Sequence, residues 1–107
     1  MFDEFEKNIM TCGYFDILNW MRGSVEAMSR DTGHYWVIKK FDKEGYPGLV
    51  LYHSHDGERY HVHFCYKNQD IAPAVSEIMS HDRYQKRKLK QRDKVAKMSN
   101  NELLRAI

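Results

Sequence analysis

Apolar side chains in the first part of the chain recur every three to four residues, a spacing typical of helices. Residues 2–10 place apolar side chains on one helical face and carry acidic residues in the first turn, where the helix dipole favours them. Residues 14–28 continue with a stripe of about four helical turns, formed by Tyr14, Ile17, Leu18, Met21, Val25 and Met28. The pattern predicts one helix that ends near Gly13 and a second that is closed at Gly33.

From residue 34 onward the apolar spacing changes to that of β-strands. Residues 34–41, 49–54 and 58–67 are rich in β-branched and aromatic side chains, and turn-forming sequences separate them. Connections this short join antiparallel neighbours, because parallel neighbours need a crossover of about a dozen residues or more. The three segments therefore predict an antiparallel β-meander.

Helical patterns return after the meander. In residues 68–79, Asp70 can cap a helix and Pro73 suits its first turn. Beyond Ser80 the apolar content falls, so this segment is expected to be either an exposed helical extension or a helix that lies on a partner. Residues 99–107 then carry a capping-box pattern and predict a short terminal helix.

These segments predict an α+β fold in which a three-stranded antiparallel meander packs against helices. The expected order is α-α-β-β-β-α, with a basic C-terminal helix. A length of 107 residues fits one domain, so we expect a single domain over residues 1–107. It divides into an acidic α/β body at 1–82 and a basic helical extension at 83–107.

Composition favours a cytoplasmic protein. No segment approaches the roughly 20 apolar residues that a membrane span needs, and the N-terminal residues lack the pattern of a signal peptide. Two cysteines are too few for a disulfide framework, so Cys12 and Cys65 are expected to be free thiols.

Charge is distributed unevenly along the chain. Residues 1–82 are acidic overall, whereas residues 83–97 hold eight basic residues and one acid. On a helix this run forms a ridge that could follow a phosphate backbone and bind it in a salt-sensitive way. The expected partner is nucleic acid or a nucleoprotein complex, an acidic protein surface comes second, and a membrane is not expected. The candidate contact residues are Arg83, Lys86, Arg87, Lys88, Lys90, Arg92, Lys94 and Lys97.

Residues 52–66, YHSHDGERYHVHFCY, hold four of the six histidines. A three-residue loop ending at Gly57 would place His53, His61 and His63 on one face, whereas a two-residue loop would separate His53 from His61. The longer loop is favoured, because it also gathers the apolar and aromatic side chains on the opposite face.

Three imidazoles on one face could hold a divalent metal such as zinc, and His53, His61 and His63 are the candidate ligands. Cys65 lies about 7 Å further along its strand than His63 and could not join the same ion as His61. The alternative is that these histidines line a surface or face a partner. No other cofactor is expected.

The tripeptide His61-Val62-His63 resembles the central motif of the HUH endonucleases, in which two strand histidines hold a divalent metal. These enzymes attack DNA with a tyrosine on a helix, and Tyr84 in YQKRK is similar to that element. The resemblance implies His61 and His63 as metal ligands and Tyr84 as nucleophile.

Together these features predict a small, non-enzymatic binding or accessory protein that contacts nucleic acid through its basic C-terminal helix. A protein-directed adaptor or inhibitor, of the kind made by phages and mobile elements, is the first alternative. A metal-dependent nuclease of HUH type is the second.

Overall fold

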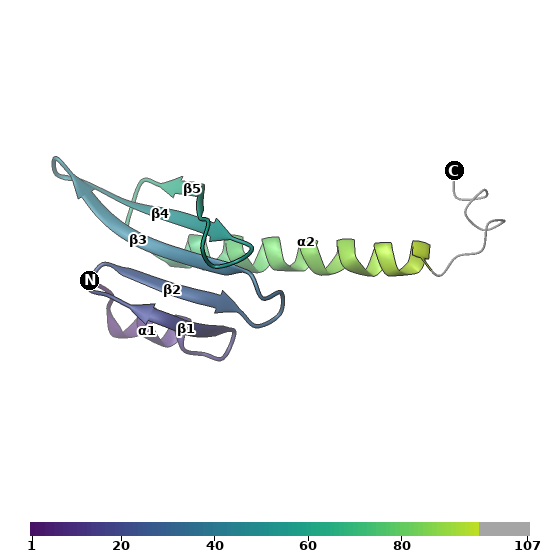
Figure 1. Cartoon of the computed structure of the whole chain (residues 1–107). Coiled ribbons are helices and arrows are strands. Elements are labelled where there is room, and N and C mark those ends of the chain that lie inside the picture. The colour runs from purple at the N-terminus through teal and green to yellow at the C-terminus, as the bar shows by residue number, and fades with distance from the viewer. Residues whose placement is uncertain (97–107) are drawn as a thin grey trace.

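The computed structural model describes residues 1–96, and within them five antiparallel strands and two helices form an α+β fold (Figure 1). The strands follow each other across the sheet in the order β1-β2-β3-β4-β5. The elements are α1 (Glu4–Met10), β1 (Phe15–Trp20), β2 (Ser24–Ser29), β3 (Tyr35–Lys43), β4 (Tyr46–Ser54), β5 (His61–Tyr66) and α2 (Ala72–Ala96). The predicted class is confirmed, whereas the predicted order and number of strands are wrong.

The error lies in residues 14–28, which form β1 and β2 rather than a helix. In β2, Val25, Ala27 and Ser29 are buried in the alternation of a half-buried strand. In β1, Ile17 pairs with Ala27 while Asn19 pairs with Glu26, so the residue between them is an extra one in a β-bulge. The bulge interrupts the two-residue period of β1, and the remaining apolar spacing coincides with that of a helix.

The remaining elements agree better with the sequence. The three predicted strands correspond to β3, β4 and β5, and the helix predicted near residue 68 is α2. Asp70 accepts a hydrogen bond from the backbone N–H of Ala72 (3.0 Å), the first residue of α2, but Ile71 and not Asp70 occupies the cap position. Helix α1 ends at Met10 rather than near Gly13. The predicted terminal helix at 99–107 lies outside the described residues.

Both helices cover the same face of the sheet. One buried cluster joins side chains from both helices and from β1 to β4, which places a single core between the two layers. Its members include Phe2, Met10, Phe15, Val25, Ala27, Trp36, Ile38, Leu49, Leu51, Ile71, Ala74, Val75 and Ile78. None of the helices in this part of the chain combines the length and hydrophobicity of a membrane span.

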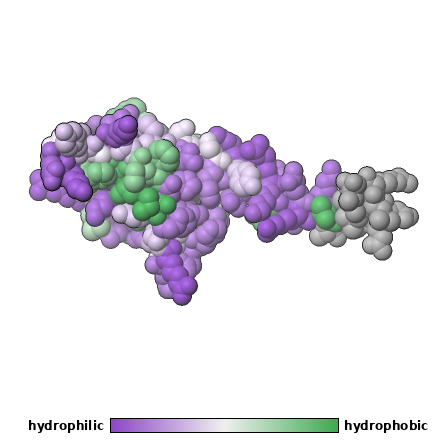
Figure 2. All heavy atoms as spheres, turned by 90° about the horizontal axis from the view of Figure 1, so that it is seen from above, coloured by the Kyte–Doolittle hydropathy of each residue, from purple (hydrophilic) through white to green (hydrophobic). Residues whose placement is uncertain are grey.

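Helix α2 has two halves with different surroundings. Its first half packs on the sheet, and Asp82 is the last buried residue among those described. From Arg83 to Val95 every residue except the half-buried Gln85 is exposed, and this half projects beyond the sheet (Figure 1). Its surface is mainly hydrophilic (Figure 2). The predicted exposed helical extension is therefore present as far as Ala96.

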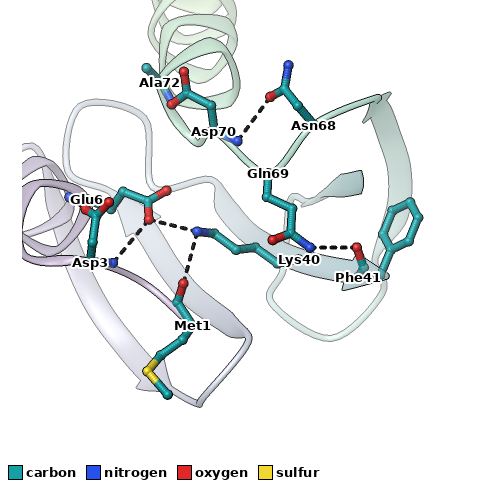
Figure 3. A network of polar contacts seen from close by, with 9 residues as sticks. All are labelled: Met1, Asp3, Glu6, Lys40, Phe41, Asn68, Gln69, Asp70 and Ala72. Carbon is teal, nitrogen blue, oxygen red and sulfur yellow. Dashed lines mark hydrogen bonds and ion pairs between the residues drawn. The ribbon is translucent and has the colours of Figure 1, made fainter. Parts of the chain in front are cut away.

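An ion pair buried between α1 and β3 fastens the first helix to the sheet. Lys40 Nζ lies 2.7 Å from Glu6 Oε1, and both side chains are only 8% exposed. Lys40 also donates to the carbonyl of Met1 (3.1 Å), while Glu6 accepts from the backbone N–H of Asp3 (Figure 3). A buried carboxylate that lost this partner would carry an uncompensated charge.

We therefore expect Lys40→Met to lower the free energy of unfolding by about 3 kcal/mol, because it leaves the Glu6 carboxylate buried and unpaired. The double variant Lys40→Met/Glu6→Gln should recover at least about 1 kcal/mol of that loss, since it removes the orphaned charge. Urea unfolding followed by circular dichroism measures both. Equal stability of the single and double variants would contradict the interpretation that Lys40 neutralises the buried Glu6 carboxylate.

Candidate functional site

The six histidines of the chain gather at one end of the sheet, beneath α2. They lie where β3 begins, β4 ends and β5 begins, and one of them comes from the helix. The ring of His53 is central, since the centroids of the five other rings lie 4.6–5.9 Å from its own. We call this group the histidine cluster; it consists of His34, His53, His55, His61, His63 and His81.

The hairpin that carries four of these histidines has a longer loop than either of the two that the sequence predicts. His53 pairs with His61, and the loop between the strands covers residues 55–60. The loop is ordered by Asp56, whose Oδ1 accepts the backbone N–H groups of Glu58 and Arg59 (2.9 Å each). These bonds lower the pKa of Asp56 to about 2. The predicted two- and three-residue loops are therefore wrong.

Two histidines of β5, beside a β-bulge, approach His53 and α2. Leu51 pairs with Phe64 while Tyr52 pairs with Val62, which leaves His63 as an extra residue. His61 shares the face of its partner His53, because paired residues of antiparallel strands lie on the same face. His63 reaches α2, where its Nε2 lies 3.1 Å from Oε1 of Glu77.

The structure thus brings together the three predicted metal ligands. A ring nitrogen of each of His53, His61 and His63 lies within 4.8 Å of the other two. Their convergence comes from the pairing of His53 with His61 across a six-residue loop, with His63 two residues further along β5. Metal binding by these three residues remains a prediction.

A second group of three was missed by sequence reasoning. A ring nitrogen of each of His34, His53 and His81 also lies within 4.8 Å of the other two. His34 Nδ1 and His53 Nε2 are 2.9 Å apart, the distance of a hydrogen bond between the two rings. His34 and His81 are far from the hairpin in sequence, and the one available signal was that His81 follows Ile78 at helical spacing on the buried face of α2.

Burial keeps the centre of the cluster uncharged. Desolvation, reinforced by the neighbouring imidazoles, lowers the pKa of His53 to about 3. Desolvation also lowers the pKa of His34 and of His81, although Asp82 opposes the shift at both. At neutral pH these rings are therefore neutral, which is the form of imidazole that binds metal ions.

A buried carboxylate on α2 positions the cluster. Asp82 is 1% exposed and accepts hydrogen bonds from the hydroxyls of Tyr14 (2.5 Å) and Thr32 (3.0 Å). Thr32 Oγ1 also accepts the backbone N–H of His34 (3.3 Å). Desolvation and the bond to Asp82 raise the pKa of Tyr14, so its hydroxyl stays a donor. This network ties the start of β3 to α2 beside His81.

Two residues considered in the sequence analysis are exposed to solvent. Cys65 is exposed and pairs with Val50, on the opposite face of β4 from His53. Tyr84 is 57% exposed and lies three residues beyond His81, about 4.5 Å further along α2. The nuclease hypothesis, with Tyr84 as nucleophile, remains a prediction.

The second candidate surface is the exposed half of α2. At 100° per residue, five basic side chains fall within an arc of about 100° on one side of the helix. We call them the basic ridge: Arg83, Lys86, Arg87, Lys90 and Lys94. Four of them line one shallow surface depression. Lys88 and Arg92 lie on another side of the helix, and Lys97 is outside the described residues.

Few acidic groups neutralise the basic ridge. Within residues 83–96 the acid is Asp93, and Lys86 forms an ion pair with Asp31 at 3.6 Å, with both side chains about half exposed. Exposed pairs of this kind contribute little to stability, about 0–1 kcal/mol. Most of the positive charge on the ridge is therefore available to a partner.

Comparison of the chain with protein-family models, with curated proteins and with solved structures found no match. Function is therefore inferred from the geometry and charge of the chain itself.

The neutral His53 ring leads to a pH prediction for the metal-free protein. Unfolded His53 binds a proton near pH 6.5 whereas the folded protein does not until about pH 3, so the unfolded state holds more protons between these values. Stability should therefore be highest above pH 6.5 and fall as the pH is lowered toward 3. The rings facing His53 are His34, His55, His61, His63 and His81.

Thermal unfolding in the presence of a chelator, at pH values from 7.5 down to 5, measures this dependence above the range in which most carboxylates titrate. The variant His53→Gln should show a shallower decrease over the same interval. An identical decrease in the variant would show that His53 titrates normally in the folded protein.

Proposed function

We propose that this protein binds nucleic acid through the basic ridge of α2, as a binding or accessory protein. The observation that carries the proposal is a run of exposed, largely unpaired cations on a helix that projects from an acidic body. The exposed half of α2 does not pack on the sheet, so packing does not explain why the helix extends this far. Its charge therefore favours a polyanionic partner.

The dimensions of the ridge suit a phosphate backbone. From Arg83 to Lys94 the helix rises about 16 Å, which corresponds to roughly five base-pair steps of a duplex. Lysine and arginine side chains at this spacing could each neutralise a phosphate and release its counterions. Binding of this kind positions the protein without reading the sequence of the bases.

The acidic body would direct binding to the helix. Residues 1–82 have an excess of acidic over basic residues, so a polyanion is repelled by the body and attracted by the extension. Because the helix projects beyond the sheet, a duplex could approach it from several sides without meeting the body (Figure 1). This arrangement also suits a nucleoprotein complex whose nucleic acid is only partly accessible.

Fluorescence anisotropy with labelled duplex DNA, duplex RNA and single strands tests the proposal. We expect affinity to fall steeply with salt, with a slope of log K against log salt of about −3 to −4, corresponding to about four neutralised phosphates. Absence of binding at low salt, or affinity that is insensitive to salt, would overturn the proposal. Binding to an acidic protein instead would support the adaptor alternative.

The chain offers a matched pair of variants for locating the contact. Arg87→Gln/Lys90→Gln removes one arginine and one lysine from the ridge, and Lys88→Gln/Arg92→Gln removes the same charges from another side of α2. We expect the first to weaken binding at least about fivefold more than the second and to reduce the salt slope by about two. Equal effects of the two variants would contradict a contact through the ridge.

A further inference from the structure

We propose that His34, His53 and His81 form a binding site for one divalent transition-metal ion of the zinc type. The site joins the start of β3, the end of β4 and the middle of α2. It does not depend on nucleic-acid binding, because the basic ridge lies further along the helix.

The distances between the ring nitrogens fit a common ion. Zinc–nitrogen bonds of 2.0–2.1 Å at a tetrahedral angle place ligand nitrogens about 3.3 Å apart. Here His34 Nδ1 and His53 Nε2 are 2.9 Å apart. One ring nitrogen from each of the three residues lies within 4.8 Å of the other two. Small side-chain rotations would therefore bring them to one ion, with a fourth position left for water or another ligand.

An unsatisfied buried atom supports the site independently. Nδ1 of His81 is buried and has no hydrogen-bond partner among the described residues. Oδ1 of Asp82 lies 3.7 Å away, which is too far for a hydrogen bond. Buried polar atoms without partners are rare in proteins, and an unseen ion is one of their explanations.

Hydrogen bonds hold the two chain segments that carry His34 and His81 next to each other. Thr32 accepts the backbone N–H of His34 and donates to Asp82, the neighbour of His81. Two ligand-bearing segments are thus held by one buried carboxylate. These contacts fix the backbone of the site and leave the ring nitrogens of both histidines to a metal ion.

The site competes with the hairpin group, which consists of His53, His61 and His63, since both need His53. A neutral imidazole offers one lone pair, so His53 can serve one of the two groups at a time. In the hairpin group His61 is exposed, and His63 already contacts Glu77. In the proposed group His53 is buried, the other two rings are half-buried, and His81 has a nitrogen without a partner. The proposed group is therefore favoured.

The ligand chemistry defines the class of metal. Imidazole nitrogens suit zinc, copper, nickel and iron, whereas calcium and magnesium prefer oxygen ligands. None of the three residues offers a carboxylate. The site should accordingly bind Zn²⁺ and Co²⁺ and not Mg²⁺ or Ca²⁺.

Isothermal titration of the untagged, chelator-treated full chain with Zn²⁺ tests the proposal, and the visible absorption of bound Co²⁺ reports the coordination. We expect one ion per chain. Removing one ligand, in His34→Gln or His81→Gln, should weaken binding by more than about 100-fold, because loss of an outer-shell partner alone costs 10–100-fold. The matched variants His61→Gln and His63→Gln should stay within about threefold of the parent.

Loss of binding in a ligand variant could also result from misfolding. For this reason two independent variants are tested, and circular dichroism checks the fold of each. Loss of affinity in His61→Gln and His63→Gln, with affinity retained in the first pair, would overturn the proposal and assign the ion to the hairpin group. Failure of the parent protein to bind Zn²⁺ stoichiometrically would also overturn it. Either result leaves the nucleic-acid proposal untouched, since that is measured by anisotropy.

Discussion

The buried carboxylate of Asp82 is the constraint on which the arrangement of this protein depends. A carboxylate without access to water must be matched by donors, and here the hydroxyls of Tyr14 and Thr32 supply them. One donor precedes β1 and the other lies in the turn between β2 and β3. The polar contact therefore determines where α2 rests against the end of the sheet.

This contact supplies a specificity that the apolar face of α2 lacks. Ile71, Ala74, Val75 and Ile78 could pack against the sheet after a shift of one helical turn, because hydrophobic contact is not directional. A shift by one turn would instead leave Asp82 buried without its donors. The position of the helix in turn places His81 at the cluster and directs the residues after it into solvent. Both candidate sites thus depend on one hydrogen-bonded group.

The sequence predicted the parts of the fold whose signals are local. The strands after residue 34, the helix after Asp70 and its exposed basic half each follow from nearby residues. The paired strands β1 and β2 were mistaken for a helix, because the extra residue Leu18 disturbs their alternation. The hairpin register was missed because the loop covers residues 55–60, and the extra residue His63 shifts the pairing once more. In both cases the position of the bulge depends on how the strand pairs with its neighbour in the sheet. The sequence of one strand alone does not reveal that pairing.

The basic ridge and the histidine cluster also differ in how far the sequence alone predicts them. The basic ridge could be read from the sequence, since helical spacing alone defines it. The grouping of His34 and His81 with His53 could not, because three separate elements create it. A histidine in a sequence identifies a side chain that can titrate near neutral pH or bind a metal ion. Tertiary packing determines which other groups it contacts.

The two bulges have a further consequence for association. They occupy β1 and β5, the two edge strands of the sheet in the part of the chain that the structure describes. An edge strand exposes unpaired backbone groups to which another chain could add a strand, and a bulge interrupts that row. Several copies held close together would therefore be less prone to edge-to-edge aggregation. The irregularities that obscure the fold in the sequence thus also make both edges of the sheet poorer templates for another strand.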